Sequence, residues 1–182
     1  LGLREADGGK VRWWTNAPRR WVGVQLQTTP FFPGLTAREN LLVIASFYGV
    51  RLSGQMAQGT LSRCGLDEVA DVDATRLSGG QQKRLSIAMA LVHNPRLVVL
   101  DEPSSALDPR AQAEVRRLVR ALAEEGIAVV LTSHDLHEVG DVADRLVLID
   151  HGQVKADGAP QALLAAHGLN RLDDLYLTLT AH

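Results

Sequence analysis

The residues best suited to chemistry in this chain of 182 residues are two adjacent acids that follow an apolar run. Residues 97–100 read Leu-Val-Val-Leu, and Asp101 and Glu102 come directly after them. Such a run is typical of a strand buried on both faces, and open α/β sheets bind ligands at the carboxyl ends of their strands. Asp101 therefore suits Mg²⁺, which prefers oxygen ligands, and Glu102 could orient or deprotonate a water. The plainer alternative is a solvated acidic strand end.

A second candidate site is the turn Ser78-Gly79-Gly80-Gln81, which follows Leu77 and precedes an expected helix. Two glycines let a backbone approach a ligand closely, and the helix start presents unpaired N–H groups with a positive dipole end. The Ser78 hydroxyl adds another donor. The turn therefore suits a terminal phosphate, although an ordinary helix-capping turn would have the same composition.

Two more polar residues that could contact a ligand lie at the ends of expected elements further along the chain. Asp108 stands at an expected helix start, where capping alone would account for an aspartate. His134 follows the expected strand at residues 127–131 and could donate a hydrogen bond to a phosphate oxygen. A metal site of His134, His137 and Glu138 is the alternative. It is disfavoured because His134 lies at the strand end and no further ligands cluster nearby.

The secondary structure expected to position these residues changes along the chain from helices to alternating strands and helices. Thr36 and Glu39 form a capping box at the start of a helix, and the whole stretch 36–93 is expected to be helical. From residue 97 onward strands and helices alternate, which predicts a parallel sheet with right-handed crossovers. The expected strands are residues 11–14, 21–26, 97–100, 127–131, 146–149 and 153–155. The expected helices are residues 36–48, 55–64, 80–92, 108–126, 136–142, a segment from 160 onward, and 172–179.

Composition and charge narrow the class of protein. A net charge of −2 with 46% apolar residues is an ordinary globular balance and gives no reason to expect nucleic-acid binding. Cys64 is the only cysteine, so no disulfide can form within the chain, and it is expected to be a small apolar core residue. No apolar run reaches the roughly 18 residues that span a bilayer.

Taken in order, these motifs resemble the ATP-binding-cassette (ABC) ATPase family over essentially the whole chain. In that resemblance residues 77–81 match the signature motif and residues 97–101 match the Walker B strand. Glu102 then matches the catalytic glutamate, residues 105–108 the D-loop, and His134 the switch histidine. Residues 22–27 look like the strand that leads into the Q-loop, with its lid glutamine at Gln27 and Gln25 as the alternative.

The resemblance implies a fold, cofactors and roles. The fold is a P-loop NTPase (RecA-like) α/β core in residues 1–29 and 95–182, with a helical signature subdomain in residues 30–94 of one ABC domain. The cofactors are ATP and Mg²⁺, and the metal is held by Asp101 and Gln27. The remaining implied residues are Glu102, His134 and Gln27 for catalysis, and Ser78, Gly79, Gly80, Gln81 and Asp108 for the nucleotide.

The family's phosphate-binding Walker A loop, G-x-x-x-x-G-K-S/T, is not found in the sequence. Residues 8–10 read Gly-Gly-Lys, but Arg4 stands five residues before Gly9 and Val11 follows the lysine. Residues 1–11 instead resemble the segment just after the Walker A helix. We therefore expect an N-terminally truncated chain that lacks the first strand and the Walker A helix. Such a chain would be inactive by itself and marginally stable.

Partners follow from the resemblance as well. ABC domains dimerise head to tail and dock on a membrane permease, so we expect a cytoplasmic protein, peripheral on the inner face of the membrane. Residues 23–41 and 172–180 look similar to ATPase subunits of bacterial drug-export systems, and Phe31 and Phe32 are expected to face the permease. The alternative is a degenerate, non-hydrolytic cassette that gives only a signature half-site to an intact partner. A soluble ATPase of ribosomes or DNA is disfavoured, because tandem cassettes and long coiled-coil insertions are absent from the sequence.

Overall fold

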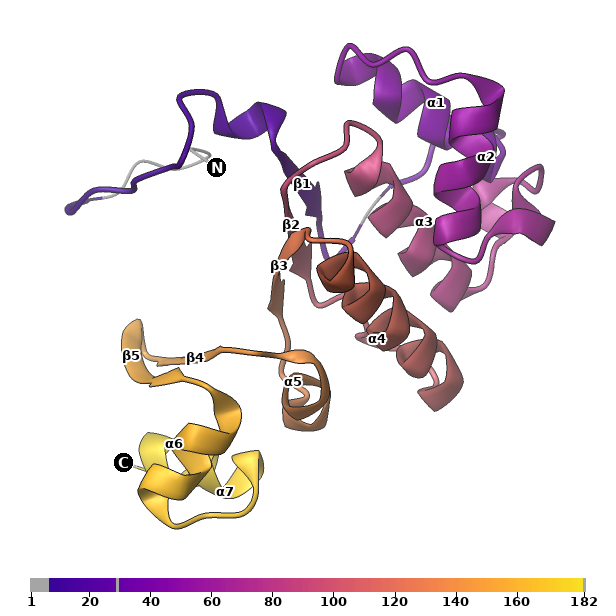
Figure 1. The fold of residues 1–182 in the computed structure, drawn as a ribbon. Coiled ribbons are helices and arrows are strands. Elements are labelled where there is room, and N and C mark those ends of the chain that lie inside the picture. Colours follow the sequence, from indigo (N-terminus) through magenta and orange to yellow (C-terminus); the bar gives the residue numbers. More distant parts are fainter. Residues whose placement is uncertain (1–6, 29, 182) are drawn as a thin grey trace. The chain divides into compact units, whose positions relative to one another are not determined.

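The computed structural model describes residues 7–28 and 30–181. Arg4 and the other residues before position 7, which were compared with the segment after a Walker A helix, lie outside the described residues, and so does Thr29. The chain divides into two compact units, Leu1–Thr132 and Ser133–His182 (Figure 1). The predicted division into core and helical subdomain does not follow this boundary and stays a prediction.

The first unit is built on a parallel sheet of three strands. The strands are β1 (Val22–Gln25), β2 (Leu97–Asp101) and β3 (Ala128–Thr132), and β2 lies in the middle. Val22 pairs with Leu97 and Leu97 with Ala128, so all three strands end at the same edge. The predicted parallel sheet is thereby confirmed for these strands. The strand expected at residues 11–14 is wrong, since this segment is irregular and pairs with no strand among the described residues.

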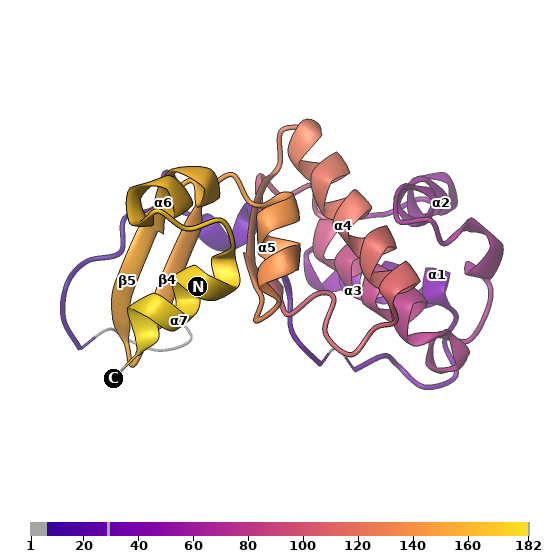
Figure 2. The same cartoon turned by 90° about the horizontal axis from the view of Figure 1, so that it is seen from below.

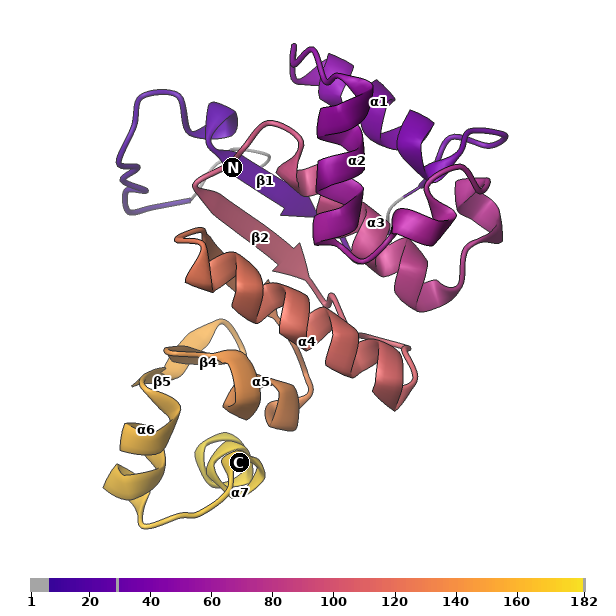
Figure 3. The same ribbon diagram turned by 45° about the vertical axis from the view of Figure 1, so that its right-hand side comes forward.

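Four α-helices complete this unit: α1 (Ala37–Phe47), α2 (Gly54–Arg63), α3 (Gly79–Leu91) and α4 (Pro109–Glu124). Three short 3-10 helices are also found among the described residues: Pro18–Arg20 precedes β1, and Asp67–Val69 and Ala74–Arg76 lie between α2 and α3. The predicted capping box is confirmed, because Thr36 N donates to Glu39 Oε2 at 2.8 Å and Glu39 N donates to Thr36 Oγ1 at 3.2 Å. Figures 1 and 3 show α1, α2 and α3 gathered beside the sheet.

Helix α3 occupies a fixed place because glycine lets its neighbours come close. A Cβ at Gly23 of β1 would collide with the carbonyl oxygen of Ala90, so β1 lies directly against α3. A Cβ at Gly80 would lie 2.8 Å from the Cβ of Ala111 on α4. Real Cβ atoms are not found so close to other carbon atoms, so both contacts require glycine. Helix α3 is therefore held at its end against β1 and at its start against α4.

Strand β3 is more exposed than its apolar sequence suggests. The stretch 127–131 was expected to be buried on both faces, but Val130 is 53% exposed, and exposed positions alternate with half-buried ones along β3. The reason is that β3 is an edge strand of the described sheet, and α4 is the helix that packs against it. A continuous apolar run is a signature of central strands, and here it stands at an edge.

The second unit pairs a hairpin with three helices. Strands β4 (Leu146–Asp150) and β5 (Gln153–Gly158) are antiparallel (Figure 2). The strand predicted at residues 146–149 is thereby confirmed, and within the second unit it pairs with β5. His151 and Gly152 have φ angles of 44° and 74°, the left-handed pair that a two-residue hairpin turn needs.

Helices α5 (Leu136–Val142), α6 (Pro160–His167) and α7 (Leu172–Thr180) build a core of their own around Val139, Leu164 and Leu175. Across residues 7–28 and 30–181, no helix combines the length and the hydropathy that crossing a bilayer requires.

Candidate functional site

The signature turn is shaped by a second capping box. Ser78 is the N-cap of α3, its Oγ accepts from the Gln81 backbone N–H at 3.3 Å, and its own N–H donates to Gln81 Oε1 at 2.9 Å. Ser78 and Gly79 are exposed, whereas Gly80 is buried against α4. The serine hydroxyl still has its own hydrogen to donate. The capping interpretation of the turn is therefore confirmed, and the binding of an anion by its exposed donors stays a prediction.

Asp101 and Glu102 lie half-buried at the carboxyl end of β2, as the sequence predicts. Thr132, which pairs with Asp101 across the sheet, organises both acids. Its Oγ1 donates to Asp101 Oδ1 at 2.6 Å and accepts the backbone N–H of Glu102 at 3.0 Å. Glu102 itself has a φ of 49°, a left-handed conformation that is unusual outside glycine and that turns the chain sharply after the strand.

The acidic end of β2 offers Mg²⁺ a single oriented carboxylate, that of Asp101. Thr132 fixes one carboxylate oxygen of Asp101, and the other, Oδ2, accepts no hydrogen bond from the described residues. No group of three or more His, Cys, Asp or Glu side chains gathers anywhere in the described part of the chain. One oriented carboxylate without a protein cage suits Mg²⁺, which commonly takes its other ligands from water and substrate phosphates.

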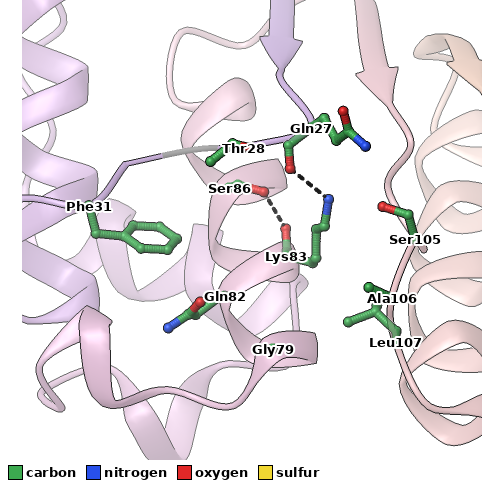
Figure 4. A pocket seen from close by; sticks show the side chains of 10 residues that line it. All are labelled: Gln27, Thr28, Phe31, Gly79, Gln82, Lys83, Ser86, Ser105, Ala106 and Leu107. Carbon is green, nitrogen blue, oxygen red and sulfur yellow. Dashed lines mark hydrogen bonds between the residues drawn. The ribbon is translucent and has the colours of Figure 1, made fainter.

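Lys83, on the first turns of α3, is a site residue that sequence reasoning missed. Its Nζ donates to the backbone carbonyl of Gln27 at 2.9 Å (Figure 4). It also donates to the backbone carbonyl of Glu102 at 3.1 Å. Burial lowers the pKa of this ammonium, and the nearby Asp101 and Glu102 carboxylates oppose the shift. The position carries no local signal of its role, because its partners come from two distant segments.

One open pocket brings several of the predicted segments together. Gln27, Gly79, Lys83 and the turn after Glu102 line it, and Figure 4 shows the Lys83 side chain between the Gln27 backbone and that turn. The full lining is Gln27, Thr28, Phe31, Gly79, Gln82, Lys83, Ser86, Ser105, Ala106 and Leu107. The signature turn, the Q-loop segment and the D-loop segment therefore share one surface.

The two glutamines of the Q-loop segment differ sharply. Gln25 is 1% exposed on β1, and its Nε2 donates to the carbonyl oxygens of Leu26 and, at 3.4 Å, of Asp101. Its buried Oε1 has no hydrogen-bond partner among the described residues. Gln27 is exposed at the pocket, where a ligand could reach its side chain. These positions favour Gln27 as the lid glutamine, a role that stays a prediction.

The D-loop segment turns tightly before α4. Ser105 Oγ donates to the Glu102 carbonyl at 3.0 Å, and Ala106 has a φ of 60°. Asp108 then caps α4, because its Oδ1 accepts from the backbone N–H groups of Arg110 at 2.9 Å and Ala111 at 3.0 Å. The capping role of Asp108 is therefore confirmed, and contact with nucleotide stays a prediction.

His134 is exposed just after β3 and belongs to the second unit, and its role stays a prediction. Of the metal ligands considered with it, Glu138 is 2% exposed and accepts a hydrogen bond from Ser133 Oγ at 2.6 Å. Near the other end of the chain, residues 8–10 are followed by irregular chain and not by a helix, so they do not form a phosphate-binding loop.

Relatives share both sequence and fold with this chain. The glutamine transport ATP-binding protein GlnQ of Escherichia coli (strain K12) is 38% identical over 163 residues, which are 86% of this chain and 66% of that protein. The Nod factor export ATP-binding protein I of Burkholderia orbicola (strain AU 1054) is 39% identical over 175 residues, 90% of this chain and 57% of that protein. The chain thus spans less than two thirds of the length of these relatives.

Solved structures of ABC proteins are also similar to this chain. One, described as an ATP-binding subunit of an ABC transporter, superposes with a TM-score of 0.75 at 26% identity over 89% of this chain and 69% of that one. Another, an ATP-binding cassette in a dimeric post-hydrolysis state with ADP and Pi, gives 0.66 at 32% identity over 78% of this chain and 64% of that one. A family model described as ABC transporter matches residues 1–105. The chain therefore belongs to the ABC transporter family and carries the sequence of its nucleotide-binding domain.

Proposed function

We propose that the protein binds and hydrolyses ATP to drive transport across a membrane. The observation that carries this proposal is the arrangement at the end of β2, where Thr132 orients Asp101 and holds the backbone of Glu102. Asp101 would hold Mg²⁺, which supplies charge neutralisation at the phosphates when bound. Glu102 would accept a proton from the attacking water, and Gln27 and His134 would orient the reacting groups.

The second part of the proposal concerns assembly. Ser78, Gly79 and Gln81 would contact the terminal phosphate of an ATP held by the Walker A loop of a second cassette in a head-to-tail dimer. The exposed N-terminus of α3 supports this, because donors that face solvent can reach an anion on another chain. The dimeric cassette among the similar structures supports the same arrangement. Asp108 would lie at this interface beside its role as a cap.

A separate membrane permease completes the proposed machine, with this subunit peripheral on the cytoplasmic face. Phe32 is 37% exposed and lies 6.3 Å, ring to ring, from Phe47, which is 73% exposed. Phe31 is half-buried and lines the pocket beside Gln27. Exposed aromatic pairs near a loop that responds to nucleotide are suited to docking a helix of a partner. Leu41, by contrast, is fully buried core.

The transported substrate is proposed to be a small molecule that is exported. Several relatives at 34–39% identity are Nod factor export ATP-binding proteins, which supports export over uptake. Because another relative is a glutamine transport protein, a small polar substrate is the alternative. A transport assay in membrane vesicles that contain the subunit and its permease would separate the two directions.

The ATPase proposal is tested with Glu102→Gln in the full-length protein. We expect hydrolysis to fall about 100-fold or more, the effect of losing a general base, while ATP still binds. Glu124→Gln, an identical change at an exposed position in the last turn of α4, is the matched control and should hydrolyse ATP like the unchanged protein. Equal hydrolysis by the Glu102 variant would refute the assignment. An unchanged protein that binds ATP without hydrolysing it would favour the half-site alternative.

A further inference from the structure

Lys83 joins two loops that serve the nucleotide site to the helix that carries the signature turn. Its ammonium donates to the carbonyl of Gln27 at 2.9 Å and to the carbonyl of Glu102 at 3.1 Å. Hydrogen bonds from a charged donor are about twice as strong as neutral ones. The Glu102 carbonyl also accepts from the Ser105 backbone N–H at 3.3 Å and from Ser105 Oγ at 3.0 Å. Ser105, in the turn after β2, and Lys83, on α3, therefore donate to the same acceptor, the Glu102 carbonyl oxygen.

The ammonium is held in place, and it is not a solvated surface charge. It is partly buried, which disfavours its charged form, and both nearby acids, Asp101 and Glu102, offset that cost. The Lys83 backbone is anchored too, since its carbonyl accepts from Ser86 Oγ at 2.7 Å (Figure 4). Burying a lysine costs desolvation free energy, and the contacts of its ammonium must offset that cost.

The signature turn and Lys83 belong to one rigid piece. Ser78 caps α3 five positions before Lys83, and Gly80 is packed against Ala111 of α4. Arg84, next to Lys83, makes an ion pair with Glu114 of α4 at 3.2 Å. A force on the signature turn therefore moves Lys83 with the helix, and any motion of Lys83 pulls on the two carbonyls that it holds.

We propose that Lys83 is a positioning residue that couples the signature turn to the Gln27 and Glu102 loops of the same chain. The inference rests on the proposed function. In a head-to-tail dimer the signature turn contacts the ATP of the partner cassette, whereas Gln27 and Glu102 act on the chain's own ATP. Lys83 then links one ATP site to the other, so that closure at one site sets the catalytic geometry of the second.

The link itself is tested without nucleotide, by hydrogen exchange on the full-length protein. Lys83→Met keeps the length of the side chain and removes the charge, so the Ser105 amide should exchange about tenfold faster, the effect of losing one charge-assisted hydrogen bond. Lys155→Met, in β5 of the second unit, is the matched control and should leave this amide unchanged. Unaltered exchange at Ser105 in Lys83→Met would overturn the proposal.

The coupling is tested by steady-state ATP hydrolysis. In Lys83→Met we expect kcat to fall about tenfold with an ATP Kd within about threefold of normal, because geometry is lost and binding is kept. The Hill coefficient for ATP should fall toward one, and Lys83→Arg should restore part of both. Unchanged kcat and Hill coefficient would refute the coupling. If the unchanged protein hydrolyses no ATP, the proposed function fails while the exchange result still decides whether Lys83 holds the two loops.

Discussion

At the scale of single residues, Thr132 shows how much of the site depends on a group that does no chemistry. Its hydroxyl donates to Asp101 and accepts from the Glu102 backbone, so one side chain sets the direction of a carboxylate and the position of a strained turn. The left-handed Glu102 backbone costs free energy that the surrounding bonds must offset. The proposed catalytic geometry therefore depends on both β2 and β3.

Thr132→Val tests this role. Valine keeps the shape of threonine but removes both hydrogen bonds, which should cost about 1–3 kcal/mol of stability. We expect ATP hydrolysis to fall at least about tenfold, because Asp101 and Glu102 lose their orientation, while ATP binding changes little. Thr60→Val, whose hydroxyl only donates to Met56 O on α2, is the control. Normal hydrolysis by Thr132→Val would contradict the role given to this hydroxyl.

The sequence identifies the residues that could react but not those that hold them. Asp101, Glu102 and Ser78 stand in short patterns whose chemistry follows from residue type and from neighbouring elements. Lys83 and Thr132 act through partners far away along the chain, and only the pairing of β2 with β3 and the packing of α3 bring those partners near. Such contacts arise from tertiary structure, which local patterns do not encode.

Cys64 provides a test of burial at the residue scale. It is 2% exposed, and burial raises the pKa of its thiol from 9.0 to about 12. The folded state therefore favours the neutral thiol. The resulting stability is complete below about pH 9 and is lost as the pH rises toward the folded pKa, at about 1.4 kcal/mol per pH unit.

Urea unfolding of the protein and of Cys64→Ala measures this effect. Relative to Cys64→Ala, the unchanged protein should lose about 1 kcal/mol of stability when the pH rises from about 9 to about 10, because the unfolded thiol is only partly ionised at the start of this range. Comparing the two proteins removes the contribution of the other titrating groups. A difference that stays constant over this range would contradict a buried, neutral thiol.

At the scale of elements, the site depends on how closely α3 approaches its neighbours. Gly23 lets β1 lie against the end of α3, and Gly80 lets its beginning lie against α4. The second glycine of the signature turn is therefore required by packing, whatever it contributes to a phosphate. The proposed function and the packing coincide at Gly80, whereas Gly79 is exposed and a Cβ added there would meet Leu107 at an ordinary distance of 3.6 Å.

Gly80→Ala should destabilise the protein by about 1–3 kcal/mol, because the added methyl group overpacks the α3–α4 contact. Gly59→Ala in α2 is the matched control, since a Cβ there meets nothing within 4 Å. That change should instead stabilise the helix by about 0.5–1 kcal/mol. Thermal or chemical unfolding gives both values. Equal effects of the two substitutions would mean that α3 and α4 do not pack as described.

Element boundaries are predictable here where a local interaction sets them. The capping residues Thr36, Ser78 and Asp108 each begin a helix at the expected position, because a cap bonds to residues only two or three positions away. The exposed face of β3 and the absence of a strand at residues 11–14 were not predictable in this way. Both depend on which segments lie alongside, and apolar content alone does not specify a neighbour.

At the scale of the whole molecule, the order of the motifs indicates the family more specifically than any single motif does. The parallel pairing of β1, β2 and β3 brings the Q-loop segment and the acidic strand end to one edge of the sheet. Each motif alone has a plain structural explanation, and several of these are also true in the structure. Residues of the Q-loop, signature and D-loop segments line one pocket, and this arrangement together with the sequence shared with ABC proteins supports the proposed composite nucleotide site.

We propose that this cassette closes on ATP with a second one. The most direct test is the molar mass of the full-length Glu102→Gln protein by light scattering, with and without Mg²⁺ and ATP. We expect the mass to double with ATP, and to stay that of a monomer when Ser78→Arg is added to block the signature turn. A protein that binds ATP and keeps the same mass, or one whose dimer ignores Ser78→Arg, would contradict it.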